Sequence, residues 1–247
     1  QWDDVAVLDL RTGRRLATQK VTSDPIDLTS ITGYYHFKQT DLNNVSGEAY
    51  PASFSQLADW EQFSQELRFQ TKLDGPVNVL FGAFYGHGSF TFNTDAYIFP
   101  VPLDPVTNTF VTFKRNNGFT TDSMSGFAEA TIAFSPKFEL SGGARYSVES
   151  RDSYQYSLPA NIAFAGVFPG GISMIDHFND TNLSPELTLR YKPQDDVMVY
   201  AAYKQGFKAG GYNISQALTL ATQQKDGQYG SETAEGGEIG LRTLLLD

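Results

Sequence analysis

The chain contains three histidines, His36, His87 and His177, and none of them has a second histidine at the spacing of a metal-binding pair. The string Gly86-His87-Gly88-Ser89 brings a hydroxyl near an imidazole, yet it lacks the Gly-x-Ser-x-Gly order of a nucleophile elbow. Phosphate-binding and dinucleotide-binding fingerprints are also missing, because no glycine-rich stretch continues into a Gly-Lys-Ser/Thr element. We therefore predict no catalytic residues and expect a protein that is not an enzyme.

One group of oxygen-bearing residues has the composition of a site for a hard cation. Its members are Asp152, Asp176, His177, Asn179 and Asp180. Their spacing differs from that of an EF-hand loop, so solvated loop carboxylates are the simpler interpretation. The sequence has no Cys, which excludes disulfides and zinc or iron–sulfur sites with Cys ligands. We predict no metal site and no cofactor, and we assign no ligand-binding residues.

Composition restricts the class of protein further. The 247 residues include 18 Lys and Arg against 28 Asp and Glu, which gives a formal net charge of -10. We expect no nucleic-acid partner, because such proteins normally carry a basic patch. The 14% of aromatic residues and the 22 glycines argue against disorder. No run of about 18 apolar residues is present, which excludes a transmembrane helix but not membrane-spanning strands.

Apolar and polar residues alternate along many segments, as in β-strands whose two faces meet different environments. In Gln62–Leu73, a mostly apolar row opposes a fully polar one. In 30–38, Ile31, Gly33, Tyr35 and Phe37 form the apolar row. Soluble antiparallel sheets also alternate, so the pattern alone does not establish a membrane. The polar rows carry a set of charges that we expect to face water or one another: Glu66, Arg68, Glu129, Arg145, Glu186, Arg190, Lys208, Glu238 and Arg242.

The connections between these segments alternate between short and long. Tight turns are predicted at 73–76, 135–138 and 192–196, and long loops at roughly 42–58, 95–120, 153–180 and 211–230. In an up-and-down sheet the tight turns then share one end, as in outer-membrane barrels. Strands of about 14 residues are also long compared with globular strands. Aromatic residues near strand ends are candidates for membrane-interface girdles, namely Tyr34, Tyr35, Phe37, Phe127, Phe134, Tyr203 and Phe207.

The sequence therefore predicts an all-β fold: an antiparallel up-and-down transmembrane β-barrel segment of about eight long strands. A further strand is expected around Arg15–Val21, ending at the turn Ser23-Asp24-Pro25. Several strings also resemble, in order and spacing, the barrel of TonB-dependent outer-membrane receptors. The resemblance extends from about Leu28 onward and is most specific over Leu183–Asn213, which includes Leu183-Ser184-Pro185-Glu186-Leu187.

The resemblance implies that residues 1–247 form part of a 22-stranded barrel, with the plug domain and the C-terminal strands absent from this sequence. It implies a receptor in the outer membrane of a Gram-negative cell that imports a scarce nutrient complex. A ferric siderophore is the first expectation, and vitamin B12, haem and glycans are further options. The implied partners are the lipid bilayer, a plug domain, TonB and the nutrient ligand.

We expect this fragment alone to be unable to transport, because it lacks the plug and would expose unpaired strand edges. Two other interpretations remain open. The first is a complete eight-stranded outer-membrane barrel with a structural or adhesive role. The second is a soluble glycan-binding β-sandwich, in which the apolar rows would face each other.

Overall fold

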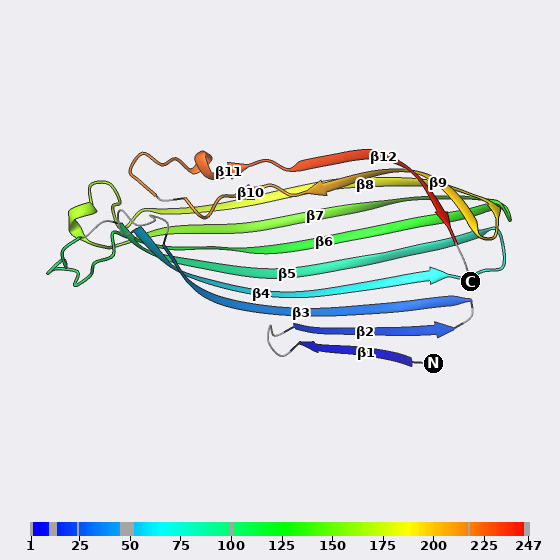
Figure 1. The fold of residues 1–247 in the computed structure, drawn as a ribbon, viewed down its shortest axis with the longest axis horizontal. Coiled ribbons are helices and arrows are strands. Elements are labelled where there is room, and N and C mark those ends of the chain that lie inside the picture. The colour runs from blue at the N-terminus through cyan, green and yellow to red at the C-terminus, as the bar shows by residue number, and fades with distance from the viewer. Residues whose placement is uncertain are drawn as a thin grey trace.

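The computed structural model describes residues 2–9, 14–23, 25–44, 52–98, 101–216 and 218–244. Ten strands form one antiparallel sheet in which neighbours in the sheet follow one another along the chain (Figure 1). In sheet order they are β1 (Trp2–Asp9), β2 (Arg14–Ser23), β3 (Ile26–Asn44), β4 (Ala52–Thr71), β5 (Val77–Ile98), β6 (Phe113–Ser135), β7 (Phe138–Leu158), β8 (Ser173–Gln194), β9 (Val197–Lys208) and β12 (Glu232–Thr243).

The connection between β9 and β12 (209–231) contains a separate two-stranded sheet formed by β10 (Gly211–Tyr212) and β11 (Gln228–Tyr229). Two short 3₁₀ helices also lie in connections, η1 (Ile162–Phe164) between β7 and β8 and η2 (Gln224–Gly227) just before β11. Among the described residues, no helix has the length and apolar character needed to cross a membrane.

The six strands β3 to β8 are 19 to 23 residues long. At about 3.3 Å per residue they extend roughly 60–75 Å, about twice the thickness of a bilayer core. The stretches 42–58, 95–120 and 153–180 were predicted as loops, and this was wrong for all described residues of 42–58 and for half of those in each of the other two, which belong to strands. Their polar composition is that of long hairpins with one face in water, which sequence alone does not distinguish from a loop.

The sheet has ten strands where about eight were predicted. Strand β2 confirms the strand expected around 15–21, and β1 pairs with it along its whole length. Asp24, in the predicted turn before β3, lies outside the described residues. Strands β1 and β12 are the two edges of the sheet and do not pair with each other. The described chain is therefore neither a closed eight-stranded barrel nor a sandwich, since the second sheet of the described residues is only the two-residue pair of β10 and β11.

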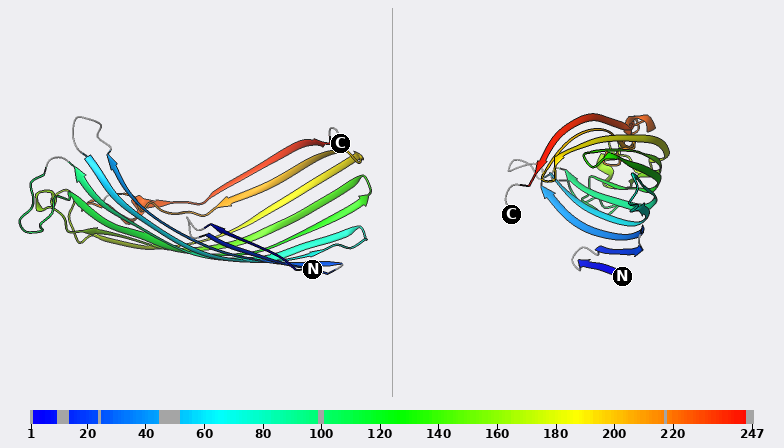
Figure 2. Two further views of the ribbon diagram at one scale, coloured as in Figure 1. Left: turned by 60° about the horizontal axis from the view of Figure 1, so that its bottom comes forward. Right: turned by 90° about the vertical axis from the view of Figure 1, so that its right-hand side faces the viewer.

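The sheet is strongly curved (Figure 2). Trp60 of β4 and Phe119 of β6 are two strands apart, yet their ring centroids lie 5.7 Å from each other. Phe54 of β4 and Phe113 of β6 meet in the same way at 6.2 Å. Strands two apart are separated by about 10 Å, so side chains that converge this far lie on the concave side. We call this side the inner face and the opposite side the outer face.

The outer face exposes large apolar side chains. Leu67 is 50% exposed, Leu241 67% and Ile239 83%. The buried apolar residues lie instead beside the long connections, and in the described chain they are Ala96, Val111, Phe113, Tyr212, Ile214 and Leu218. The sheet thus has no hydrophobic core of its own along most of its length, and its apolar surface requires a solvent other than water.

The register between β3 and β4 shows which of their rows share a face. Gly33 pairs with Ser64 and Ile31 pairs with Glu66, so the apolar row of β3 lies on the inner face beside the polar row of β4. The outer row of β3 contains Ser30 and Thr32 instead. Thr32 donates a hydrogen bond to Gln65 at 2.6 Å, which satisfies two polar groups within the otherwise apolar outer face. Alternation identified the strand but not which of its rows faces outward.

Candidate functional site

The outer face carries a continuous apolar band near the short turns. On β5 the band runs from Val77 to Tyr85, and on β8 from Leu183 to Tyr191, nine residues in each case. This matches the roughly 9–11 residues that a tilted strand needs to cross the hydrocarbon core. Stacked ring pairs lie at the short-turn end of the band, Phe69 with Phe81 (centroids 4.7 Å apart) and Phe138 with Tyr191 (4.5 Å).

Tyrosines define the opposite limit of the band. Each points its hydroxyl toward a carboxylate that lies on a neighbouring strand, one step nearer the long connections. The hydrogen bonds are Tyr34 to Glu61 (2.9 Å), Tyr85 to Asp122 (3.0 Å) and Tyr203 to Glu235 (2.9 Å). An apolar ring with a solvated hydroxyl is the usual side chain of a membrane interface.

The predicted girdle residues divide between the two faces. Tyr34, Tyr203 and Phe207 lie on the outer face, as a girdle requires, whereas Phe134 is exposed at the register shift between Ala133 and Ser135. Tyr35, Phe37 and Phe127 lie on the inner face, so their assignment to a girdle was wrong. The physical reason is the period of two, because neighbouring residues of one strand never share a face.

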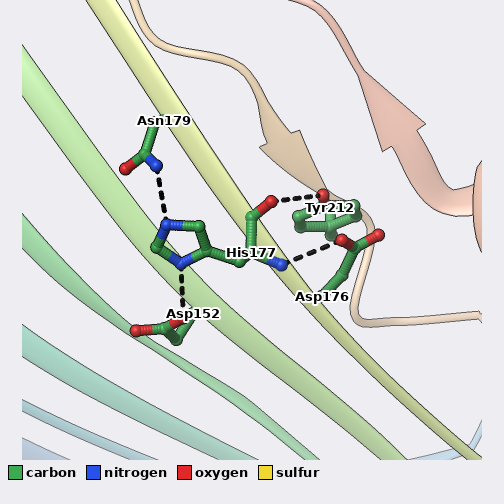
Figure 3. A network of polar contacts seen from close by, with 5 residues as sticks. All are labelled: Asp152, Asp176, His177, Asn179 and Tyr212. Atoms are coloured by element: carbon green, nitrogen blue, oxygen red, sulfur yellow. Dashed lines mark hydrogen bonds and ion pairs between the residues drawn. The ribbon is translucent and has the colours of Figure 1, made fainter.

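Beyond the tyrosines the outer face becomes polar, and each of the three histidines contacts an aspartate there. The nitrogen-to-oxygen distances are 2.9 Å for His36–Asp59, 2.8 Å for His87–Asp122 and 2.6 Å for His177–Asp152. Figure 3 shows the His177 ring held between Asp152 and Asn179, while Tyr212 donates to the His177 main-chain oxygen. These contacts are cross-strand pairs on a water-facing surface.

The residues that had the composition of a cation site do not form one. His177, Asp152 and Asn179 belong to the outer face, whereas Asp176 and Asp180 belong to the inner face. In the described part of the chain, no group of three or more His, Asp or Glu side chains is placed to hold a metal. The oxygen atoms of Asp176 and Asp180 accept instead from Gln228 Nε2 (3.0 Å) and the Thr181 main-chain N–H (2.8 Å).

On the inner face near the short turns, basic and acidic side chains neutralise one another. Register places all nine charged residues predicted to line the polar rows on this face. The ion pairs are Arg68–Glu66, Arg190–Glu139, Lys204–Glu186 (3.4 Å) and Lys72–Asp27 (2.7 Å). These pairs neutralise part of the charge on the wall, while Glu129 and Glu238 accept hydrogen bonds from the Thr131 and Tyr200 hydroxyls.

Further from the short turns the inner face changes to aromatic rings and arginines. Trp60, Phe90 and Phe119 contact one another, with centroids 5.5 to 5.7 Å apart. The Arg151 guanidinium lies 4.7 Å from the Phe119 centroid. Arg145 lies between two rings, 5.5 Å from Phe84 and 5.4 Å from Phe127. We call these rings and arginines, with Arg115 over Phe113, the aromatic–arginine wall.

A glycine makes room for this wall. A Cβ built on Gly82 would lie 2.4 Å from the Phe127 ring and 2.4 Å from the Leu67 main-chain oxygen. The Phe127 ring therefore occupies the space that any other residue would fill at position 82. In this position it is one of the two rings that contact Arg145.

The 209–231 connection folds onto the inner face of β6 to β8. The Arg115 guanidinium donates to the Ser215 main-chain oxygen, and the Asn117 amide donates to that of Ile214. Arg151 donates to the Tyr229 hydroxyl at 3.3 Å. Buried polar atoms around this contact lack a protein partner, namely Arg115 Nε, Asn117 Oδ1, Ser153 Oγ and Gln155 Oε1. The surface beneath the connection is thus built for polar groups that the connection satisfies only in part.

Two other long connections are joined by a buried aspartate and an asparagine. Asp104 is 3% exposed and accepts from Thr107 Oγ1 (2.5 Å), the Val106 N–H (2.9 Å) and the Ile162 N–H (3.0 Å). These hydrogen bonds, first that from Thr107, lower the pKa of Asp104. Asn161 donates to the main-chain oxygen of Pro102 at 2.9 Å. The 101–112 and 159–172 connections therefore form one unit at this end of the sheet.

The arrangement has the chemistry of a recognition surface and not of a reaction centre. Guanidinium groups over aromatic rings, beside amides and hydroxyls, can bind an oxygen-rich ligand by stacking and hydrogen bonding. Sequence analysis named Arg145 only as one of the wall charges and missed Arg115, Arg151 and the aromatic cluster. The aromatic residues Trp60, Phe90 and Phe119 were the signal that could have been recognised. They lie in or near stretches that were predicted as loops.

Known proteins share this fold. The curated pesticin receptor of Yersinia pestis is 26% identical over 264 aligned residues, which cover 100% of this chain and 35% of that protein. The crystal structure of the ferric yersiniabactin uptake receptor of Yersinia pestis superposes with a TM-score of 0.75 at 20% identity, covering 96% of this chain and 34% of that one. The unliganded ferric citrate transporter has a TM-score of 0.58 at 15% identity, covering 93% and 32%.

The chain thus spans about a third of the length of the relatives that it matches. A family profile described as TonB dependent receptor-like, beta-barrel, matches residues 3–247. This match covers nearly the whole chain and agrees with the open, curved, up-and-down sheet. The chain belongs to the TonB-dependent receptor β-barrel family.

Proposed function

We propose that this chain is part of the barrel wall of an outer-membrane receptor that imports a ferric siderophore complex into a Gram-negative cell. The observation that carries the proposal is the division of the same strands into two halves. One half has an apolar outer band of bilayer thickness, and the other projects beyond it and bears the Trp60–Phe90–Phe119 cluster with Arg151 and Arg115 of the aromatic–arginine wall. The names of two relatives, for ferric yersiniabactin uptake and ferric citrate transport, support iron complexes as the cargo class.

The proposal includes the partners that import requires. The wide inner face, with its rows of charged side chains, is suited to a plug domain supplied by the rest of the protein. Energy would come through TonB, since a barrel wall has no means of its own to move a ligand against a gradient. In this account the protein is a receptor and transporter, not an enzyme.

The test is iron uptake by cells that carry or lack the complete receptor. Cells with the receptor should accumulate radioactive iron from at least one ferric siderophore, and removal of TonB should abolish that accumulation while leaving binding at the cell surface intact. A receptor with Leu187→Arg in the apolar band is the control for membrane assembly. Equal uptake with and without the receptor, across a panel of ferric complexes, would contradict the proposal.

A further inference from the structure

Three arginines of the inner face, on the interior strands β6 and β7, are not neutralised by acids; Arg242, on the edge strand β12, also forms no ion pair in the described part of the chain. In the described part of the chain, Arg115, Arg145 and Arg151 form no ion pair with a carboxylate, although the chain has ten more acidic than basic residues. The carboxylates of Glu149 and Asp176, on the same face, accept hydrogen bonds from Ser123 and Gln228 instead. An unpaired, half-buried guanidinium is costly, so three of them on one wall indicate a partner that is not part of this sheet.

The three arginines are regularly spaced. Arg145 and Arg151 are six residues apart on β7, and Arg115 of β6 pairs with Ser157, which is six residues further along β7. At about 3.3 Å per residue the steps are about 20 Å long. They lead from the level of the apolar band to the end of the sheet near the long connections. We call this row the arginine ladder.

Each arginine of the ladder is held by a ring and presents its hydrogen-bonding edge. Arg115 lies 5.6 Å from the Phe113 centroid, Arg145 contacts Phe84 and Phe127, and Arg151 lies over Phe119. A contact with the face of a ring uses the charge of a guanidinium without requiring a carboxylate partner, so its N–H groups can still bind oxygen acceptors. The contrast is with Arg68 and Arg190, on the same face, whose N–H groups bond to Glu66 and Glu139.

The outermost position of the ladder already shows which atoms it selects. Main-chain carbonyl oxygens of Ser215 and Ile214 accept from Arg115 and from the neighbouring Asn117. A carbonyl oxygen carries only a partial negative charge, and the Arg115 Nε–H remains without a partner. An anionic oxygen would satisfy the guanidinium better than the connection does.

We propose that the arginine ladder binds the anionic groups of the imported complex at successive positions along the inner face, so that the cargo of this receptor is an anionic, oxygen-ligated metal complex. This inference rests on the proposed function and narrows its substrate class. Arg115, next to the 209–231 connection, is the first contact, and Arg151 and Arg145 follow toward the membrane. A plug-domain carboxylate is the competing partner for the same guanidinium groups.

The experiment uses the complete purified receptor and probes that differ in charge. Equilibrium binding is measured for ferric citrate and iron-free citrate, which are anionic, for the neutral ferric trihydroxamate ferrichrome and for the cationic ferrioxamine B. The ladder variants are Arg115→Gln, Arg145→Gln and Arg151→Gln. The matched controls are Arg68→Gln and Arg190→Gln, which remove arginines of the same face that have carboxylate partners.

The wild-type receptor should bind the anionic probes at least about tenfold more tightly than the neutral one. Each ladder variant should lose about tenfold in affinity for the anionic probes and little for the neutral one. The two control variants should stay within about twofold of wild type. Arg151→Lys should lie between Arg151 and Arg151→Gln, because it keeps the charge and loses the planar fork.

Three results would overturn the inference: no anionic probe binds, the neutral or cationic probe binds equally well, or the controls lose as much affinity as the ladder variants. Loss of thermal stability in the ladder variants with unchanged probe binding would assign the arginines to the plug. Uptake of neutral iron complexes without anion preference would contradict this inference and leave the proposed function standing. Binding of anions without any iron uptake would contradict the proposed function and leave anion binding by the arginine ladder standing.

Discussion

The two halves of each long strand carry different residue types on both the outer and the inner face. In the half near the short turns, apolar residues such as Leu67 and Leu187 face outward, and the inner arginines Arg68 and Arg190 are paired with glutamates. In the projecting half, the outer face carries His–Asp pairs, and the inner face carries Trp60, Phe119 and Arg151, which forms no ion pair in the described part of the chain. The fold is continuous across the boundary, so we attribute the difference to the surroundings that the proposed function implies: lipid outside one half, and water and ligand around the other.

The largest effect that separates the halves is expected from a charge on the outer face. Leu187→Arg lies within the apolar band and should destabilise the complete receptor by about 2–4 kcal/mol, because its guanidinium would face hydrocarbon. Thr120→Arg lies on the same face beyond Tyr85 and should cost no more than about 1 kcal/mol. Denaturant unfolding in lipid vesicles measures both values. Equal destabilisation by the two variants would contradict a limit of the apolar band between their two positions.

Next in size is the aromatic cluster of the projecting half. Trp60→Ala removes contacts with Phe90 and Phe119 and should lower the free energy of unfolding by about 2–3 kcal/mol, since the indole is half-buried. Phe69→Ala, at the short-turn end of the outer face, is the control in the lipid-facing half. In vesicles Trp60→Ala should retain wild-type membrane insertion, and a failure to insert would contradict the assignment of Trp60 to the projecting half.

Paired and unpaired arginines should differ in what they contribute. Arg190→Gln leaves Glu139 without its partner and should cost about 1 kcal/mol of stability. Arg151→Gln removes a guanidinium–ring contact and a long hydrogen bond to the exposed Tyr229 hydroxyl, and it should cost about 0.5 kcal/mol. Thermal unfolding of both variants decides the order. The reverse order would mean that the ladder, and not the ion pairs, holds the wall together.

A smaller effect is expected at the tyrosine boundary. Tyr85→Phe deletes the hydroxyl that donates to Asp122 and keeps the ring, so it should cost about 0.5–1 kcal/mol. Tyr146→Phe is a matched control on the same face, on β7, two strands away from Tyr85 on β5. A larger loss at Tyr146 than at Tyr85 would show that hydroxyl-to-carboxylate bonding does not define the boundary.

The most local effect concerns pH. The folded pKa of Asp104 is depressed from its ordinary value of 3.8, so its contribution to stability is present above that value and is lost as the pH falls through the folded pKa. The 101–112 and 159–172 connections should then become cleavable by an acid-active protease while the strands stay protected. In Asp104→Asn the cleavage should already occur at neutral pH. Cleavage that is unchanged in the variant would contradict the role of this carboxylate.

Much of the fold followed from the alternation of residue types, because a strand with two environments leaves a period of two. Alternation predicted the strand in 62–73, which ends at Thr71 in the structure. Turn-forming residues predicted the turns at 73–76, 135–138 and 192–196. The alternation in β3 did not show which row faces outward, and its apolar residues Ile31 and Phe37 face inward. Which row of a strand faces outward depends on its register with the neighbouring strands. The alternation within one strand does not provide that register.

The candidate site was less predictable than the fold. Arg115, Arg151 and Phe119 are far apart or in different strands, and only the pairing of β6 with β7 brings them together. The stretches that contain them are polar because one face contacts water, and this made them resemble loops. The docking of Ile214 and Ser215 on β6 joins residues about a hundred positions apart, which no local pattern encodes.

The most direct test of the two-halves account is a cysteine scan along β5, since the chain has no cysteine of its own. Single cysteines from Val77 to Asp95 in the complete receptor would be labelled, and quenching by lipid-borne and water-soluble quenchers compared. The account predicts lipid contact at 77, 79, 81, 83 and 85, ending abruptly at His87. Lipid contact at the even positions, or at odd positions beyond His87, would contradict it.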